Sequence, residues 1–518
     1  MNQGNAKAHT ALGGWGPQVK KYWVLGLLCG FGILTFVTWF AQTEAFIADD
    51  SFFYLVVARH IVLDTHQTFS GLYSTNGFHP LWLYLLTIYS WFISLIDKDL
   101  LFHAEYILPL SILLVLGTIY NFYRIASKLK LDILSLTLLP LIYLAVFNLL
   151  YSEGHLFFYT LSALLWLTVN GTWQRRYGHY LIGVVSASIM LARLDSVFFV
   201  GAYYLWFFYK DPHKKRIILS ALLSAGLVLP YLVTNIVFFG GMTPISGWIK
   251  SGFPQVIFTG IKYYGGYVVQ LSGYNLLFGV VPLLLACYIF LFLPIKEEEL
   301  SLLVPLFVGT FLHFLYIAFF VGDKTPWYWY FVQPVTLGAF SIALLMRDLH
   351  LPKVVKPVFF GLVLSMAVLI LLYRSQQGFL PGIKEPLQYL QSNDIQNSTI
   401  LVSDYPGTMA FYTNNQIIAA DMLTGNRNFF EKMVKSGNAL EYILTYSSNK
   451  GKPVSYVFFV GGKWLEPVDD RNAIIYYDPK QIKSKQVEIG FLEMGPPIAV
   501  IKNGGLGGND FIVWHLSN

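Results

Sequence analysis

The segment from Glu44 to Trp82, EAFIADDSFFYLVVARHIVLDTHQTFSGLYSTNGFHPLW, decides the fold expected for this chain. It follows an apolar run at residues 22–43 that is long enough to cross a bilayer. Two adjacent carboxylates, Asp49 and Asp50, open it at the expected water interface. Carboxylates at a hydrocarbon boundary are costly unless they are hydrated or functional, so both are candidate site residues. The alternative is a solvated loop in which Asp50 caps a helix.

The composition is that of an integral membrane protein. Of the 518 residues, 55% are hydrophobic and 12% are charged, whereas about a quarter of the residues in a soluble domain are charged. The two cysteines, Cys29 and Cys287, lie in apolar runs, so no disulfide framework is expected. The N-terminal region has no cleavable signal pattern, and its apolar run is expected to stay in the membrane.

Apolar runs of spanning length recur over the first 375 residues. They lie at residues 22–43, 104–123, 132–150, 155–171, 178–192, 196–209, 216–239, 273–294, 300–320, 329–346 and 355–373. A further run at 81–96 is slightly short, and the runs at 178–192 and 196–209 can instead form a tilted pair.

The basic loops decide whether the run at 81–96 crosses, because Lys and Arg collect on the cytoplasmic side. If this run lies along the outer surface, the basic loops all share one side. They contain Lys20, Lys21, Arg124, Lys128, Lys130, Arg175, Arg176, Lys210, Lys214, Lys215, Arg216, Lys296, Arg347, Lys353 and Lys356. We therefore predict a polytopic α-helical protein with about eleven spans, about twelve or thirteen being the alternative. Its first external loop holds two juxtamembrane helices, Ser51–Ile61 and Leu81–Ile96.

The composition changes after residue 375, where the chain becomes polar and has no further spanning run. β-rich and helical patterns alternate there. The strands are expected at Thr399–Val402, Gln416–Ala419, Val454–Val460 and Ala473–Tyr477, and the helices at Lys384–Ser392, Phe429–Ser436 and Ala439–Thr445. We predict a membrane domain at residues 1–375 and a small α/β domain at residues 376–518. An odd number of spans places the second domain outside.

The external loops of this topology hold side chains suited to a site, whereas the cytoplasmic loops are short and basic. A carboxylate is a suitable general base, and isolated Lys250 and Arg193 suit a phosphate. The candidates are Asp49, Asp50, Asn76, His79, Glu153, Arg193, Asp195, Lys250 and Tyr328. Each candidate also has a structural alternative. Arg193 and Asp195 can form an ion pair, and His79 can make a hydrogen bond at a helix start. Lys250 can extend its ammonium group to the membrane interface, and the aromatic residues can form an interfacial belt.

No pattern typical of a metal or nucleotide site is present. The sequence has no P-loop and no cysteine ligands, and a solvated turn explains Asp97-Lys98-Asp99. We expect no cofactor, and a divalent cation held by Asp49, Asp50 and Glu153 is the alternative. An enzyme that acts outside needs a pre-activated donor delivered through the membrane, and a sugar on polyprenyl phosphate is the class expected.

Two motifs, Ala-Asp-Asp-Ser-Phe-Phe-Tyr at 48–54 and Thr-Asn-Gly-Phe-His-Pro-Leu-Trp at 75–82, resemble the GT-C superfamily of membrane glycosyltransferases. This superfamily includes protein O-mannosyltransferases, lipid A aminoarabinose transferases and mycobacterial arabinofuranosyltransferases. The turns at 152–155 and 192–196 and the loop at 243–250 also fit bacterial relatives. The resemblance covers residues 20–350 and does not specify the sugar.

The resemblance implies a GT-C-like fold with juxtamembrane helices in the first external loop. It also implies a polyprenyl-phosphate sugar donor and an acidic pair at the catalytic centre, here Asp49 and Asp50. The chain departs from the pattern at Tyr151-Ser152-Glu153-Gly154, where relatives often have Gly-x-Glu-Thr.

We predict an inverting glycosyl transfer at the periplasmic face of a bacterial inner membrane. Asp49 or Asp50 takes the proton of an acceptor hydroxyl, and Lys250 and Arg193 hold the donor phosphate. The residues expected to bind substrate are Asn76, His79, Glu153, Asp195 and Tyr328. The acceptor is a glycan, a lipid or a protein, and no nucleic acid is expected. The alternatives are a transporter or flippase, which the scarcity of mid-span charge disfavours, and an inactive glycan-binding relative.

Overall fold

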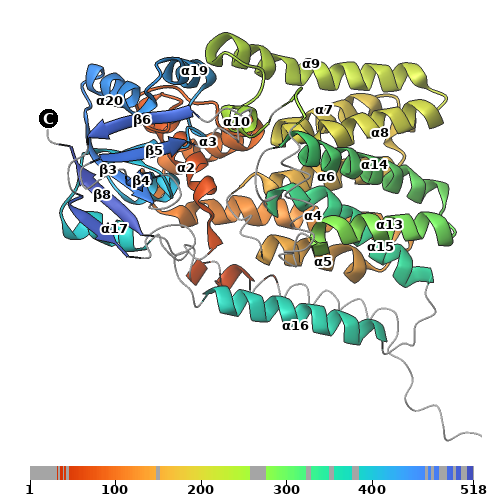
Figure 1. Cartoon of the computed structure of the whole chain (residues 1–518). Coiled ribbons are helices and arrows are strands. Elements are labelled where there is room, and N and C mark those ends of the chain that lie inside the picture. Colours follow the sequence, from red (N-terminus) through yellow and green to blue (C-terminus); the bar gives the residue numbers. More distant parts are fainter. Residues whose placement is uncertain are drawn as a thin grey trace, which may run out of the picture.

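Helix α2 (Asp49–Asp64) lies between a bundle of apolar helices and a sheet-containing C-terminal region (Figure 1). The computed structural model of the chain describes residues 32, 35–38, 40–41, 46–146, 152–251, 253–256, 276–321, 328–348, 355–375, 384–460, 465–467, 472–477, 487–493, 497–502 and 510–516. The predicted first span at 22–43 lies largely outside these residues.

Each predicted apolar run from 104–123 to 355–373 coincides with a helix. These are α4 (Leu108–Leu129), α5 (Ile133–Val146), α6 (Gly154–Val169), α7 (Gly178–Ala192), α8 (Val197–Lys210), α9 (Lys214–Phe239), α13 (Val281–Phe292), α14 (Glu297–Phe320), α15 (Val332–Asp348) and α16 (Val355–Ser375). Outward-facing leucines such as Leu205 and Leu291 are 72% and 74% exposed, as expected for helices that face lipid.

Some helices of the bundle are long enough to cross a membrane by themselves. Over the described residues, four combine sufficient length and apolar character: Ala104–Leu129, Lys214–Phe239, Glu297–Phe320 and Trp329–Asp348. Shorter apolar helices, such as Gly154–Val169 and Gly178–Ala192, accompany them. The fold is therefore a mostly helical membrane fold, and the total of about eleven spans stays a prediction.

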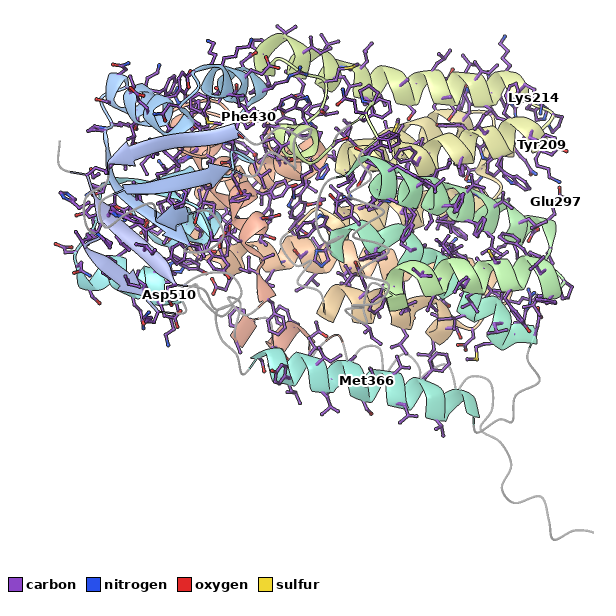
Figure 2. All side chains as sticks on the ribbon, viewed as in Figure 1. Tyr209, Lys214, Glu297, Met366, Phe430 and Asp510 are labelled. Carbon is purple, nitrogen blue, oxygen red and sulfur yellow. The ribbon has the colours of Figure 1, made fainter. Side chains whose placement is uncertain are left out.

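The loops predicted to be cytoplasmic meet at one end of the bundle. Nζ of Lys210 lies 3.8 Å from Oε1 of Glu297, and Arg347 pairs with Glu299. Figure 2 shows Lys214 and Glu297 at the end of the bundle far from Phe430, which belongs to the C-terminal region. The loops before α9 and before α14 thus share one end of the bundle, as the predicted topology requires.

The two helices predicted in the first external loop are both present, as α2 and α3 (Pro80–Ser94). Helix α2 begins at Asp49 and has Ala48 as its N-cap, so the alternative that Asp50 caps a helix is wrong. The first turn instead contains both aspartates, where the helix dipole favours negative charge. Residues 51–59 of α2 are all buried, because protein covers the helix on every side.

The C-terminal region is built on a five-stranded sheet of order β2-β1-β3-β8-β7. Its strands are β1 (Thr399–Val402), β2 (Gln416–Ala419), β3 (Val454–Val460), β7 (Ala499–Ile501) and β8 (Phe511–His515). β1 is parallel to β2 and β3, whereas β8 is antiparallel to β3 and β7. A second sheet contains β4 (Leu465–Pro467), β5 (Asn472–Tyr477) and β6 (Val487–Glu493).

Most of the predicted elements of this region are confirmed. The predicted strands correspond to β1, β2, β3 and β5, and the predicted helices to α17 (Lys384–Ser392), α19 (Arg427–Lys435) and α20 (Ala439–Asn449). The sequence analysis missed α18 (Pro406–Tyr412) because a seven-residue helix is too short to show a 3.6-residue period.

Helix α18 packs against α2 through its two ends. The backbone N–H groups of Gly407 and Thr408 donate to the Asp49 carboxylate at 3.2 and 2.7 Å, and the Thr408 hydroxyl adds a third bond at 2.7 Å. At the other end, Arg59 donates to the carbonyl oxygen of Ala410 at 3.0 Å. Negative charge at a helix N-terminus and positive charge at its C-terminus are both favourable, so the two helices lie parallel and in a defined register.

We expect Gly407→Ala to loosen this contact. A Cβ atom at Gly407 would meet the Asp49 carbonyl oxygen and lie 2.9 Å from Cδ1 of Phe53, on a helix too buried to move aside. Overpacking of this kind costs about 1–3 kcal/mol. The apparent melting temperature in detergent should therefore fall, whereas Gly201→Ala, where nothing lies within 4 Å, should leave it unchanged. Equal melting temperatures for both variants would contradict the close contact.

Candidate active site

The two adjacent aspartates point in different directions. Successive residues of an α-helix are about 100° apart around its axis, so Asp49 and Asp50 cannot share one face. Asp49 faces α18, whereas Asp50 lines a cavity of about 530 Å³. Tyr54, one turn further along α2, lines the same cavity. The structure thus separates the predicted catalytic pair into a residue of the cavity and a residue of the contact with α18.

The cavity lies at the end of the bundle opposite the basic loops. Its walls come from α2, the turn before α3, the starts of α6 and α8, and α10 (Ile245–Lys250). The predicted site residues that line it are Asp50, His79, Glu153, Arg193, Asp195 and Lys250. Residues from four of the loops that were predicted to be external therefore converge, as the predicted topology requires.

A buried ion network forms one wall. Arg193, which is 3% exposed, donates from Nη1 to Glu153 at 2.8 Å and from Nη2 to Asp195 at 2.7 Å. Tyr54 donates its hydroxyl to Glu153 at 3.2 Å. His313 of α14 lies 3.2 Å from Oδ2 of Asp195 through its Nε2 atom. The network ties α2, α6, α7 and α14 together at the mouth of the bundle.

The carboxylates of this network already balance the positive charge of the Arg193 guanidinium. Burial opposes ionisation, but Asp195 and Glu153 raise the pKa of Arg193 above its usual value. Burial also opposes the charge of Asp195, yet Arg193 and His313 hold the pKa of Asp195 well below its usual range. The ion pair between Arg193 and Asp195 that the sequence analysis held as an alternative is therefore present. Two carboxylates compete with any phosphate for this arginine.

Lys250 and His79 are the other polar side chains of the cavity that the sequence analysis identified. Nζ of Lys250 lies 5.7 Å from the centre of the Trp329 ring, within cation–π range. Burial lowers the pKa of His79, so its ring is neutral near pH 7. His79 is the N-cap of α3 but makes no capping bond through its side chain. Its Nδ1 atom is buried and has no hydrogen-bond partner among the described residues, and its Nε2 atom lies 3.7 Å from Oε1 of Glu153.

Two residues that were predicted to bind substrate, Asn76 and Tyr328, are not among the described residues that line the cavity. Asn76 is buried and donates its amide to Asn235 at 3.3 Å, and Asn235 donates in turn to the Met242 carbonyl at 3.2 Å. These bonds fix the turn before α3 against the end of α9. Tyr328 opens a short helical turn, Tyr328–Phe331, but its side chain lies outside the described residues.

The C-terminal region completes the cavity. Leu423, in the loop that follows β2, lines it, and the Leu423 N–H donates to Oδ1 of Asp421 at 3.0 Å. Burial raises the pKa of Asp421 to about 7, with the charge of Asp50 adding to the effect and that of Lys250 opposing it. A Cβ atom on Gly77 would overlap the Leu423 carbonyl oxygen, so only glycine permits this approach. The parallel strands thus direct their carboxyl ends at α2, where such sheets commonly bind ligands.

The sequence analysis missed Tyr54, His313 and Leu423. A signal for Tyr54 exists, because it lies four residues after Asp50 and therefore on the same helix face. His313 interrupts an apolar run, and an ionisable residue within a membrane helix indicates a function by default. Leu423 has no such signal, since its place in the cavity depends on how the C-terminal region packs against the helices.

The described part of the chain does not gather side chains into a metal site. No group of three or more His, Cys, Asp or Glu side chains is placed there to hold an ion. In particular, Asp49 turns towards α18 and Glu153 is occupied by Arg193 and Tyr54, so the acidic trio considered above is not assembled around one point.

No protein-family model and no curated protein matches the sequence. The fold matches ArnT from Cupriavidus metallidurans. The apo crystal structure has a TM-score of 0.51 at 11% identity and covers 86% of this chain and 94% of that chain. The crystal structure bound to undecaprenyl phosphate has a TM-score of 0.50 at 11% identity and covers 89% and 98%. The arabinofuranosyltransferase AftD from Mycobacteria matches with a TM-score of 0.44 at 13% identity over 84% of this chain and 35% of that chain.

These comparisons show which fold the chain has. The chain has the polytopic helical fold of ArnT, which is a GT-C membrane glycosyltransferase. The resemblance to the GT-C superfamily that the two motifs around the acidic pair indicate is thus confirmed at the level of the fold.

We expect Arg193→Gln to lower folding stability. Removal of one partner from a buried ion network leaves uncompensated charge and costs about 3–5 kcal/mol. The apparent melting temperature should fall strongly, and Arg193→Lys should give an intermediate value because it keeps the charge but loses the bidentate fork. Lys215→Gln, at an exposed position in the first turn of α9 at the other end, is the matched control. A normal melting temperature for Arg193→Gln would show that the network does not hold the bundle together.

The stability of the protein should fall as the pH rises from about 4 to about 7, the interval between the unfolded and folded pKa values of Asp49. Loss of hydration, opposed by the bonds from Thr408 and Gly407, raises the pKa of Asp49 from 3.8 to about 7. A raised carboxyl pKa contributes stability below the unfolded value, and this stability is lost as the pH passes the folded value. Asp49→Asn, which cannot ionise, should reduce the fall in melting temperature over this range. Glu441→Gln, at an exposed position, should reproduce the wild-type curve.

Proposed function

We propose that this protein transfers a sugar from a polyprenyl-phosphate donor to an acceptor hydroxyl with inversion, using Asp50 as the general base. The observation that supports this most directly is that Asp50 and Lys250 line one cavity at the non-basic end of the bundle. The ArnT structure bound to undecaprenyl phosphate has the same fold, which supports a lipid phosphate as the donor carrier here.

The proposed reaction is a single displacement. The acceptor oxygen attacks the anomeric carbon as the bond from that carbon to the phosphate oxygen breaks. Asp50 takes the acceptor proton, and the electron pair of the broken bond stays on the departing polyprenyl phosphate. A positioned carboxylate base contributes about 10²–10⁴-fold to such a step.

Lys250 is the proposed partner of the donor phosphate. It is a flexible point charge beside the Trp329 ring, and it can follow the charge that grows on the leaving oxygen. Arg193 instead positions Glu153 and Asp195, since both carboxylates already occupy its fork. His79 also lines this cavity and is the proposed contact of a sugar hydroxyl.

The remaining parts of the proposal concern location and composition. Residues 1–375 form the membrane domain of a bacterial inner-membrane protein with about eleven spans. Residues 376–518 lie in the periplasm, on the side of Asp50, where they hold the acceptor. Phosphate leaves readily once its charge is stabilised, so we propose that the reaction needs no metal ion.

Proteoliposomes supplied with a panel of labelled polyprenyl-phosphate sugars test this function. Wild-type protein should transfer label from one donor, and Asp50→Asn should lower that rate by about 10²–10⁴-fold. Asp49→Asn should retain more than about a tenth of the rate, because Asp49 acts through α18 and not on the substrate. Asp394→Asn, on the exposed surface of the C-terminal region, is the matched control.

Three outcomes would overturn parts of the proposal. Transfer from none of the donors would leave a transporter or a glycan-binding protein as the function. Full activity in Asp50→Asn would remove the base. Loss of transfer in Asp49→Asn with retention in Asp50→Asn would exchange the roles of the two aspartates.

A further inference from the structure

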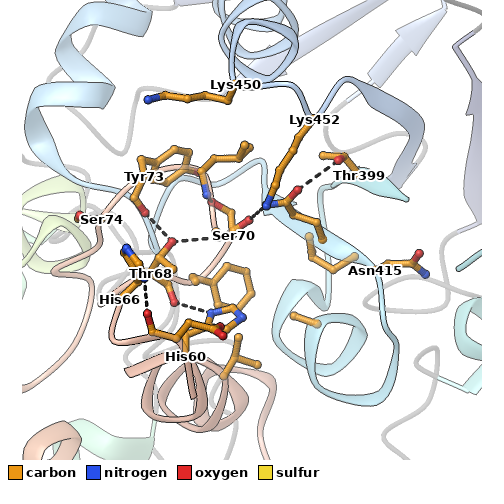
Figure 3. Close-up of a pocket in the computed structure, with 18 of the residues that line it drawn as sticks. His60, His66, Thr68, Ser70, Tyr73, Ser74, Thr399, Asn415, Lys450 and Lys452 are labelled. Carbon is orange, nitrogen blue, oxygen red and sulfur yellow. Dashed lines mark hydrogen bonds between the residues drawn. The ribbon is translucent and has the colours of Figure 1, made fainter. Parts of the chain in front are cut away.

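A second, larger cavity lies beside the C-terminal half of α2. Its volume is about 1300 Å³, above the range of about 300–1000 Å³ that is usual for sites that bind one small molecule. It is enclosed by the C-terminal half of α2, the turn at residues 66–74 and the C-terminal region around β2, α19 and α20 (Figure 3). We call this cavity the lysine groove.

The charge of the lysine groove is strongly positive. Of the described residues that line it, Arg59, Lys432, Lys450 and Lys452 are cationic, whereas Asp64 is acidic. The three lysines are exposed, so their ammonium groups are accessible from outside. Figure 3 shows Lys452 extending towards the turn that carries Ser70 and Tyr73, and Nζ of Lys450 lies 5.8 Å from the centre of the Tyr446 ring. The groove therefore attracts a ligand with several negative charges.

The remaining lining suits carbohydrate. The rings of Tyr442 and Tyr446 stack with their centres 6.1 Å apart. Both side chains are half-buried, so part of each ring is open to the groove. Exposed side-chain amides of Asn397, Asn414 and Asn428 offer both donors and acceptors for hydroxyl groups. Aromatic faces combined with amides and cations match an acidic sugar chain better than an apolar ligand.

The floor of the groove is held in place by hydrogen bonds. The Thr68 hydroxyl donates to the Tyr73 carbonyl at 2.7 Å, and Nδ1 of His60 donates to the Thr68 carbonyl at 2.8 Å. The side chain of Gln416, at the start of β2, donates to the Ser70 carbonyl. A preformed floor lowers the entropic cost of binding a flexible chain.

The lysine groove and the catalytic cavity share a wall. The Asn76 N–H donates to the Gly425 carbonyl at 3.3 Å, and the Asn426 side chain donates to the Ser74 carbonyl at 2.6 Å. Ser74 and Asn426 line the groove, whereas Gly77 and Leu423, a few residues away, line the catalytic cavity. The groove and the catalytic cavity are therefore only a few residues apart along both segments, although none of the described residues lines both.

We propose that the lysine groove binds an anionic oligosaccharide, the part of the acceptor that precedes the hydroxyl to be glycosylated. The anionic groups are carboxylates or phosphates of the sugar chain. Its identity as acceptor rests on the proposed function, whereas its binding does not.

Binding to the full chain in nanodiscs of neutral phosphatidylcholine tests this inference. The probes are tetragalacturonate, a phosphorylated pentamannose and neutral maltotetraose. The two anionic probes should bind at least tenfold more tightly than maltotetraose, and added salt should weaken them because surface charges are screened. The double variant Lys450→Glu/Lys452→Glu should weaken both anionic probes at least tenfold.

Matched variants distinguish binding in the groove from a general effect of protein charge and from an effect on catalysis. Lys384→Glu/Lys435→Glu makes the same charge change at exposed lysines outside the groove and should bind as the wild type does. Asp50→Asn should also bind normally, so loss of transfer and loss of binding are independent results. Equal affinity for maltotetraose, no binding of either anionic probe, or an equal loss in both double variants would overturn the proposal. Affinity for phosphatidylglycerol vesicles alone would assign these lysines to the membrane and overturn it as well.

Discussion

The pairing of α2 with α18 is the contact on which the site depends. Asp49 accepts from the first N–H groups of α18, and Arg59 donates to its last carbonyl groups. These bonds fix the rotation of α2 about its own axis. Because Asp50 follows Asp49 by one residue, that rotation directs Asp50 into the cavity of about 530 Å³. The C-terminal region therefore takes part in building the site although it lies outside the helical bundle.

The two cavities beside this contact differ in charge. The cavity that Asp50 lines contains the carboxylates of Asp50, Glu153 and Asp195 together with the cations of Arg193 and Lys250, whereas the neighbouring groove is rich in lysine. In the cavity, buried opposite charges satisfy one another and hold the helices in place. In the groove, exposed lysines carry their charge into solvent. Docking of the C-terminal region creates both environments, since its loops contribute to each wall.

Several features were predictable from the sequence. Backbone in lipid must satisfy its own hydrogen bonds, so apolar runs of sufficient length are helices, and the runs from 104–123 onwards are helical in the structure. The strands β1, β2 and β3 follow from short β-rich runs between polar turns. The importance of the segment from Asp49 to Trp82 was also readable, because carboxylates and polar turns beside a membrane span are costly.

By itself, the sequence determined the helical membrane class, the α/β tail and the group of loops that meet at the site, because these follow from local periodicity and charge. Only the tertiary structure decided which aspartate faces the cavity, that Arg193 is already paired, and that the tail completes the walls. Asp49 and Thr408 are 359 residues apart in the chain. Contacts over such separations depend on how whole domains pack, which no local pattern encodes.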